Sequence, residues 1–393
     1  MDFEFSKEEQ QFLREVGAFL EENNDPKYMD VTRENMAQVC DTPERREFTK
    51  KLAEKGWMGI TWPKQYGGQD GAGFYEYLLN EKLSSYGAPQ IGKGVGIIGK
   101  TLINVGSEKL KQEFLPQILD AKIEFAVGYS EPSAGSDAAA MKLKAERKDD
   151  GWLLNGQKVF TTSAHFADWY WVGARTDPDA KKHHGISLFL IRMDDPGLTI
   201  HPMYTMGGER TNAVFFDNVF VHDDYRVGDL NKGFQYIAEA LDIERFSMFT
   251  FSPIRGRMEL LCDYVKTAKR DGKPLKDDPV IRQKIAQLTT ELEVARVLGV
   301  RFVDAALNST KTPTVEASHY KLYATELSRR IADTTMDIVG PGAQLALHTE
   351  DAPLKGRSES CYTYTVIDTI GGGSSEVQRN IIATRGLGLP RNF

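Results

Sequence analysis

The apolar residues in the first third of the chain follow the period of amphipathic helices. The first helix is predicted to begin after Ser6, because Ser6 and Glu9 have the spacing of a capping box. Its buried face is expected to consist of apolar residues at helical spacing, namely Phe12, Leu13, Val16, Phe19 and Leu20. Further helices are predicted near residues 44–55, 73–86 and 107–120.

Between about residues 123 and 230 the period changes to that of β-strands. Asp149-Asp150-Gly151 has the composition of a hairpin turn and lies between the strand-like segments LKAER and WLLNGQKVF. The segments WYWVGAR, GISLFLIRM and AVFFDNVFVH are rich in aromatic and β-branched residues, as strands are. The middle of the chain is therefore predicted to form a sheet.

From about residue 231 onward the pattern is helical again. Long helical segments are predicted near residues 232–269, 278–307, 315–339 and 374–385. The order of helices, strands and helices predicts an α+β fold of three domains. We expect an N-terminal helical domain at 1–122, a middle β domain at 123–230 and a C-terminal helical domain at 231–393.

The composition narrows the class of protein. The chain has 393 residues, of which 41% are hydrophobic and 27% charged, and its net charge is −7. An acidic balance argues against broad binding to nucleic acid. No apolar run is long enough for a membrane span, the N-terminus is acidic where a signal peptide is basic, and three scattered cysteines favour a reducing compartment. We therefore expect a cytoplasmic protein, and the histidine spacing predicts no metal site.

One short motif points elsewhere. The segment GVGIIGKT, from Gly94 to Thr101, fits the phosphate-binding P-loop pattern. A P-loop follows a buried strand, whereas the preceding residues, SSYGAPQIGK, are typical of a helix end and a turn. A P-loop nucleotide-binding protein remains an alternative, but the context favours a glycine-rich helix-packing segment with Lys100 in solvent.

Three other segments contain the candidate ligand-binding residues. They are GYSEPSAGSD at 128–137, NGQKVFTTSAHFADWYWV at 155–172, and DTIGGGSSEVQRNIIATRGLGLPR at 368–391. Glycine and hydroxyl residues allow backbone N–H groups and side-chain hydroxyls to approach a ligand closely. A helix beginning near Ser374 would offer free N–H donors to an anionic group.

On these segments the chain resembles the acyl-CoA dehydrogenase family over essentially its whole length. EPSAGSD and QRNIIATR resemble the two signatures of that family. The resemblance implies a helical domain, a β domain and a C-terminal four-helix bundle. It also implies FAD-dependent α,β-dehydrogenation of an acyl-CoA in lipid or amino-acid catabolism, transfer of electrons to an electron-transfer flavoprotein, and a homotetramer or dimer.

The resemblance further implies which residues hold FAD. Ser130 matches a hydroxyl that bonds the edge of the flavin ring, and Phe160 and Thr162 match residues along the isoalloxazine. Ser374 and Glu376 match positions that hold the adenosine end, usually in a neighbouring subunit. The complete cofactor set implied by the resemblance is Tyr129, Ser130, Ser136, Phe160, Thr162, Ser374 and Glu376.

The reaction also needs a base, because the α-C–H of a thioester is a weak acid. Many relatives carry a tyrosine and the glutamate base in the glycine segment, where this chain has Gly371 and Gly372. The segment EALDIERFSMF at 239–249 resembles the alternative arrangement of isovaleryl-CoA dehydrogenases and places Glu244 at the base position. The other interpretation is an ordinary helix glutamate paired with Arg245 or Arg255.

The same resemblance implies the substrate contacts. The backbone N–H of Gly372 matches a donor to the thioester carbonyl, and the residues matched to substrate or CoA contacts are Ser136, Asp242, Arg245 and Gly373. Two glycines in place of tyrosine and glutamate leave volume beside the reacting carbons. That volume suits an acyl group that is branched or cyclic near Cα and Cβ more than a straight chain, and we expect a short, branched or cyclic acyl-CoA as the substrate.

The segment TAKRDGKPL at 267–275 departs from the family pattern. Where many relatives have an arginine and a phenylalanine that contact FAD across a subunit interface, this chain has Ala268 and Asp271. Lys269 or Arg270 could substitute after a small shift. An FAD-binding partner subunit of a mixed complex therefore stays open as an alternative function.

Overall fold

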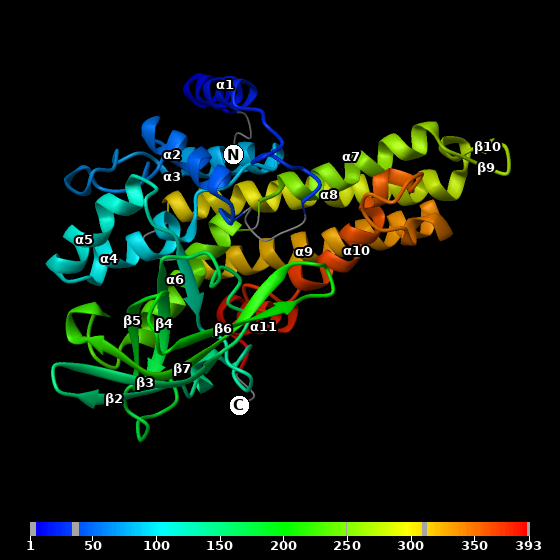
Figure 1. The fold of residues 1–393 in the computed structure, drawn as a ribbon. Helices are drawn as coiled ribbons and strands as arrows, with labels where there is room; N and C mark the ends of the chain where they lie inside the picture. The colour runs from blue at the N-terminus through cyan, green and yellow to red at the C-terminus, as the bar shows by residue number, and fades with distance from the viewer. Residues whose placement is uncertain (1–4, 34–38, 249, 309–312, 391–393) are drawn as a thin grey trace.

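The structure is a computed structural model that describes residues 5–33, 39–248, 250–308 and 313–390. The side chains of residues 242–248 and 307–308 lie outside this description. In Figure 1 the N-terminal helices, in blue and cyan, lie above the green strands, and the long yellow and orange helices run across the molecule. The predicted α+β fold is confirmed.

The N-terminal part is helical, as predicted. Its helices are α1 (Lys7–Glu22), α2 (Pro43–Glu54), α3 (Gly73–Ser85), α4 (Lys100–Val105) and α5 (Glu108–Leu119). The capping box is confirmed, since Ser6 Oγ accepts from the Glu9 N–H at 3.1 Å and the Glu9 carboxylate accepts from the Ser6 N–H at 2.7 Å. In α1, Val16, Phe19 and Leu20 are buried and Phe12 is partly buried, so the predicted face packs inward.

The Gly94-to-Thr101 segment forms no phosphate-binding loop. Residues Gly94–Gly99 form the π-helix η3, which continues directly into α4. A Cβ on Gly99 would lie 2.0 Å from Trp62 Cζ2, so glycine is needed there for close packing. The packing interpretation is confirmed, but the expectation of a solvated Lys100 is wrong. Its ammonium lies 3.0 Å from the buried carboxylate of Glu76, because that charge needs a partner.

The middle of the chain forms an eight-stranded sheet in the order β6-β7-β3-β2-β4-β5-β8, with β1 paired to β4. The strands are β1 (Phe125–Gly128), β2 (Lys144–Lys148), β3 (Gly151–Lys158), β4 (Trp169–Arg175), β5 (Ile186–Arg192), β6 (Leu198–Tyr204), β7 (Arg210–His222) and β8 (Arg226–Val227). The β2–β3 hairpin is confirmed by the pairing of Lys148 with Gly151. Asp149 takes the positive φ of 49° that this tight turn requires.

Both faces of β4 and β5 are buried. Trp169, Trp171 and Leu188 belong to the core shared with the N-terminal helices. Tyr170 and Phe189 point to the opposite face and join a second core within the β region. The alternation follows from the two-residue period of a strand, and it fixes the sheet firmly against the helices.

The C-terminal part is a bundle of long helices. They are α6 (Gly233–Met248), α7 (Ser252–Thr267), α8 (Pro279–Asn308), α9 (Thr314–Val339), α10 (Arg357–Asp368) and α11 (Ser375–Ile381), with a small hairpin of β9 (Lys269–Arg270) and β10 (Lys273–Pro274). The prediction of one continuous segment at 232–269 is wrong. Pro253 stands in the first turn of α7, where proline is tolerated because the backbone N–H there needs no helical partner.

Short turns of 3₁₀-helix join these elements, at Lys64–Tyr66, Ala138–Ala140, Asp223–Tyr225, Leu275–Asp277, Pro341–Gln344 and Pro353–Gly356, and a π-helix follows α11 at Ile382–Gly386. Within the described ranges, no helix has the length and apolar character needed to cross a bilayer. The same ranges contain no group of histidine, cysteine and acidic residues that could hold a metal ion.

Candidate functional site

The loop that follows β1 carries the first group of candidate residues. Tyr129 OH accepts a hydrogen bond from Trp171 Nε1 at 2.8 Å, and the Ser130 carbonyl accepts from the Val159 N–H at 3.0 Å. Both contacts tie the loop to neighbouring strands. Ser130 is half-buried and Ser136 is exposed, so their hydroxyls stay within reach of a ligand.

A buried ion pair holds this loop in place. Lys158 Nζ lies 2.7 Å from Glu131 Oε1, and both side chains are almost completely removed from water. Glu131 also accepts hydrogen bonds from the backbone N–H groups of Lys142 and Leu143. Burial lowers the pKa of Lys158 to about 8, and the nearby Glu131 carboxylate opposes that shift. The pair therefore joins the loop to β3, because either charge would be strongly destabilising if it were buried without the other.

The turn after β3 presents an aromatic ring to the outside. Phe160 has a φ of 58° and its side chain is 61% exposed. The next residue, Thr161, is buried and fixed by Tyr170 OH at 2.8 Å and by the Asn212 carbonyl at 3.0 Å. An unusual backbone conformation thus holds an aromatic side chain out of the core, next to the half-buried Thr162.

Thr162 also lines a cavity of about 460 Å³. The walls come from the 162–166 turn, the β6–β7 turn with Arg210, the loop before α2 and the segment that precedes α10, including His348. Its volume is within the usual range for a small-molecule site. The cavity places the Thr162 position beside elements from the N-terminal, middle and C-terminal parts of the chain.

The glycine segment between α10 and α11 forms a turn with two left-handed residues, since φ is 64° at Gly372 and 91° at Gly373. Lys321 Nζ donates to the Gly373 carbonyl at 2.9 Å, and Gln378 Nε2 donates to the carbonyls of Gly372 and Gly373 at 3.1 and 3.0 Å. Among the described residues, no hydrogen bond uses the N–H of Gly372 or Gly373. The carbonyls are held from one side and the N–H groups remain available.

Ser374 begins α11, as predicted. Its hydroxyl accepts from the Val377 N–H at 3.4 Å and so satisfies one donor at the helix start. Glu376 is exposed, and its pKa is lowered, first by a hydrogen bond from its own backbone N–H and then by the Ser374 hydroxyl. Glu376 is therefore open to solvent, whereas Ser374 is half-buried.

The predicted base and CoA contacts fall on α6. Asp242, Glu244 and Arg245 belong to this helix, but their side chains lie outside the described residues. The following segment is anchored, because Glu81 accepts hydrogen bonds from the N–H groups of Phe251 and Ser252 at the start of α7.

The segment with Ala268 and Asp271 lies at the far end of the bundle, where the β9–β10 hairpin projects (Figure 1). Asp271 takes the positive φ of 50° at its tip. Arg270 donates to the Ile338 carbonyl at 2.5 Å, which ties the hairpin to the end of α9. This contact occupies part of a guanidinium that could otherwise reach a neighbouring molecule.

Several supporting residues were missed in the sequence. Glu131 and Gln378 lie inside the two signature segments, and a search of those segments for buried polar side chains could have found them. Lys158 and Lys321 give no local signal, because each meets its partner only after the chain folds.

Comparison with known proteins gives matches to one family in all three parts of the chain. Sequence profiles described as the N-terminal, middle and C-terminal domains of acyl-CoA dehydrogenase match residues 6–122, 126–219 and 231–387. The acyl-CoA dehydrogenase FadE26 of Mycobacterium tuberculosis is 31% identical over 353 residues, which are 88% of each chain.

Solved structures agree. A chain of the "Tcur3481-Tcur3483 steroid ACAD" superimposes with a TM-score of 0.90 at 31% identity, and the match covers 100% of both chains. A chain of the ChsE4-ChsE5 complex from Mycobacterium tuberculosis superimposes with a TM-score of 0.88 at 30% identity, again over 100% of both chains.

Proposed function

The chain belongs to the acyl-CoA dehydrogenase family of oxidoreductases that act on acyl-CoA, and we propose that it uses FAD to place an α,β double bond in a short, branched or cyclic acyl thioester. The observation that carries this proposal is the glycine turn at 371–373. The carbonyls of Gly372 and Gly373 are fixed by Lys321 and Gln378, while no hydrogen bond among the described residues uses the two N–H groups, which leaves them to bind an oxygen of the substrate.

The residues after β3 fit a flavin. Phe160 offers an exposed aromatic ring, and Thr162 lines the neighbouring cavity of about 460 Å³, as a flat, partly apolar cofactor requires. Ser130 and Tyr129 hold the near edge of the ring, while Ser136, Ser374 and Glu376 serve its phosphate and adenosine parts. When bound, FAD supplies the acceptor for the hydride that leaves the β-carbon.

Glu244 removes the α-proton in this proposal. The Gly372 N–H donates to the thioester carbonyl and stabilises the negative charge that develops there as the proton leaves. The left-handed turn supports this role, because Lys321 and Gln378 already orient its peptide groups before substrate binds. Asp242 and Arg245 contact the CoA portion, together with Ser136 and Gly373.

The acyl group is branched or cyclic near the reacting carbons. Gly371 and Gly372 carry no side chains, so the turn leaves room on the substrate side. Similarity to a protein named as a steroid ACAD supports a bulky acyl group. Electrons pass to an electron-transfer flavoprotein, and the subunits assemble as a homotetramer or dimer.

A second candidate assembly is a mixed complex in which this chain is one of two kinds of subunit. Similarity to a chain of the ChsE4-ChsE5 complex favours it. Purification of the chain alone distinguishes the two. A chain that binds FAD and oxidises acyl-CoA by itself supports the homomeric enzyme, whereas activity that appears only after a homologous subunit is added supports the mixed complex.

The experiment for the proposed reaction is an anaerobic titration of the purified protein with straight, branched and alicyclic acyl-CoA thioesters. We expect a yellow protein whose visible flavin absorbance is bleached by branched or alicyclic members. A protein that binds FAD but is bleached by no thioester, alone or with a partner subunit, contradicts the proposed reaction. A protein that stays colourless after FAD is supplied contradicts the cofactor.

A further inference from the structure

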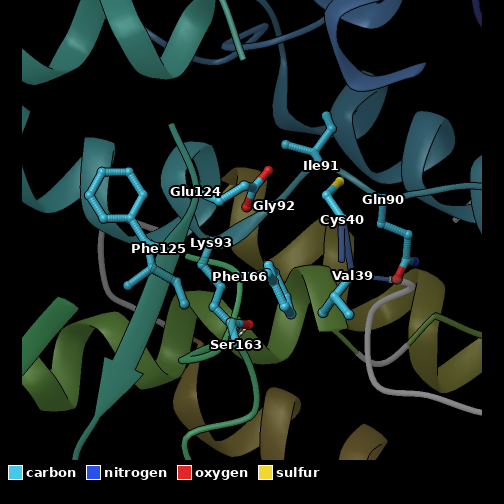
Figure 2. Close-up of a pocket in the computed structure, with 11 residues that line it drawn as sticks. Val39, Cys40, Gln90, Ile91, Gly92, Lys93, Glu124, Phe125, Ser163 and Phe166 are labelled. Atoms are coloured by element: carbon cyan, nitrogen blue, oxygen red, sulfur yellow. Dashed lines mark hydrogen bonds between the residues drawn. The ribbon is translucent and has the colours of Figure 1, made fainter. Parts of the chain in front are cut away.

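A second, much smaller cavity lies between the loop before α2, η3 and the turn after β3. It has a volume of about 30 Å³, which is the room that one water molecule or one oxygen substituent occupies. Apolar walls are provided by Val39, Ile97, Phe125 and Phe166. Figure 2 shows polar side chains entering the same space from different segments of the chain.

The polar groups include both signs of charge. Lys93 donates from Nζ to Ser163 Oγ at 3.3 Å, and the Glu124 carboxylate lies near Gly92. Ser163 is buried. A hydrogen-bond donor, an acceptor and a hydroxyl therefore line a space that admits one small group.

This cavity lies beside the larger one that Thr162 lines. Ser163 directly follows Thr162, and Phe166 lines both this cavity and the larger one of about 460 Å³. On the other side, Gln90 contacts Thr250 at 3.4 Å, in the segment that joins α6 to α7. An acyl group held between Thr162 and α6 would point its far end toward Lys93 and Glu124.

The balance of charge indicates which substituent fits. A carboxylate would bond Lys93 but would face the Glu124 carboxylate, and an ammonium group would face Lys93. A hydroxyl accepts from one group and donates to the other. Burial raises the pKa of Glu124 to about 7, against the opposing effect of Arg46 and Lys93, so above that pH this side chain is a carboxylate that accepts a hydrogen bond from a hydroxyl.

We propose that this cavity binds a hydroxyl group on the distal part of the acyl chain, with Lys93, Ser163 and Glu124 as its hydrogen-bond partners. The inference rests on the proposed acyl-CoA dehydrogenation and specifies its substrate class as hydroxylated acyl thioesters. A site that hydrogen-bonds a substrate hydroxyl rejects the analogue without it, because its buried polar groups are then left unpaired.

The test compares matched thioesters in anaerobic flavin reduction and in steady-state kcat/KM. One set is hexanoyl-CoA, ω-hydroxyhexanoyl-CoA and adipoyl-CoA, and the other is cyclohexylacetyl-CoA with its ring-hydroxyl and ring-carboxyl derivatives. We expect the hydroxyl member of at least one set to exceed its parent by about tenfold or more. A carboxylate preferred over the hydroxyl, or no preference in either set, overturns the proposal.

Substitutions of the three lining residues test whether this cavity causes the preference for the hydroxyl substrate. Lys93→Met, Glu124→Gln and the milder Ser163→Ala should each reduce the ratio of hydroxyl to parent kcat/KM. The control Lys122→Met, at an exposed lysine paired with Asp120, should leave the ratio unchanged. An equal loss for parent and hydroxyl substrates in all three variants overturns the proposal and assigns the cavity to folding. If no thioester reduces the flavin, the proposed reaction itself has failed, which differs from reduction without preference.

Discussion

The ammonium nitrogen of Lys321 lies 2.9 Å from the carbonyl oxygen of Gly373. The lysine comes from the N-terminal third of α9 and is fully buried, whereas the glycine belongs to the turn between α10 and α11. A charge in this position holds a turn that has no side chains of its own. The contact thereby links the packing of the bundle to the orientation of the peptides that we propose bind the substrate carbonyl.

Replacing Lys321 with methionine should therefore lower kcat more than it raises KM. The variant loses a charge-assisted hydrogen bond of roughly 1.5–3 kcal/mol, and the Gly372 N–H is then less well oriented toward the carbonyl. We expect a loss of about tenfold or more in kcat. Steady-state kinetics with the best acyl-CoA measures it, and Lys284→Met, at an exposed lysine of α8, is the control. Unchanged kcat in a folded Lys321→Met protein would show that the contact does not position the turn.

The Lys158–Glu131 pair should be needed for stability. Lys158→Met leaves the Glu131 carboxylate buried without its countercharge, which costs about 3–5 kcal/mol. Chemical denaturation should show this loss in the free energy of unfolding. The matched variant Lys144→Met removes an exposed lysine in β2 and should change the free energy of unfolding by less than about 1 kcal/mol. Similar stability of the two variants would contradict the role given to the buried pair.

Glycine at position 99 should also be needed for the stability of the fold. Gly99→Ala forces a methyl group against the Trp62 ring, and overpacking of this kind destabilises by about 1–3 kcal/mol. Gly256→Ala is the control, because nothing lies within 4 Å of a Cβ at this position of α7. Alanine there should be neutral or stabilise by roughly 0.5–1 kcal/mol. Thermal unfolding of the two variants measures the difference. Equal melting temperatures would contradict the claim that close packing against Trp62 requires glycine at position 99.

The stability of the protein should fall as pH rises through the titration of Glu124. The ordinary pKa of a glutamate, which applies to the unfolded chain, is 4.5. In the folded protein the pKa of Glu124 is about 7, mainly because the carboxyl is buried. The folded state therefore binds more protons than the unfolded state between these values, and the free energy of unfolding decreases from about pH 4.5 to about pH 7.

Glu124→Gln should remove this part of the pH dependence. The charged neighbours Arg46, Lys93 and Asp168 remain in the variant. Denaturation measured at several pH values gives the slope for each protein. A slope in the variant equal to that of the wild type would show that another group causes the dependence.

Local chemistry allowed several features to be predicted from the sequence. The capping box of α1, the hairpin at Asp149 and the helix start at Ser374 depend on residues within a few positions of one another. The break between α6 and α7 was missed, although Pro253 was visible, because the helical period runs through both segments. Local pattern gives the elements but not always their ends.

Contacts distant in the sequence could not be predicted. Lys100 was expected in solvent, yet Glu76 of α3 binds it, and nothing in the local sequence around Lys100 indicates that partner. Lys321 likewise meets the glycine turn only through the packing of α9 against the end of the bundle. The sequence segments located the candidate site, whereas the side chains that support its backbone emerged from tertiary packing.

The most direct test of the proposed chemistry is the rate of anaerobic flavin reduction by the best acyl-CoA in Glu244→Gln, beside wild type and Glu239→Gln. Glu239 is an exposed glutamate on the same helix and serves as the matched control. We predict that Glu244→Gln still binds FAD and acyl-CoA but reduces the flavin about 10²–10⁴-fold more slowly, with Glu239→Gln close to wild type. Flavin reduction in Glu244→Gln at the wild-type rate would contradict the assignment of the base to α6.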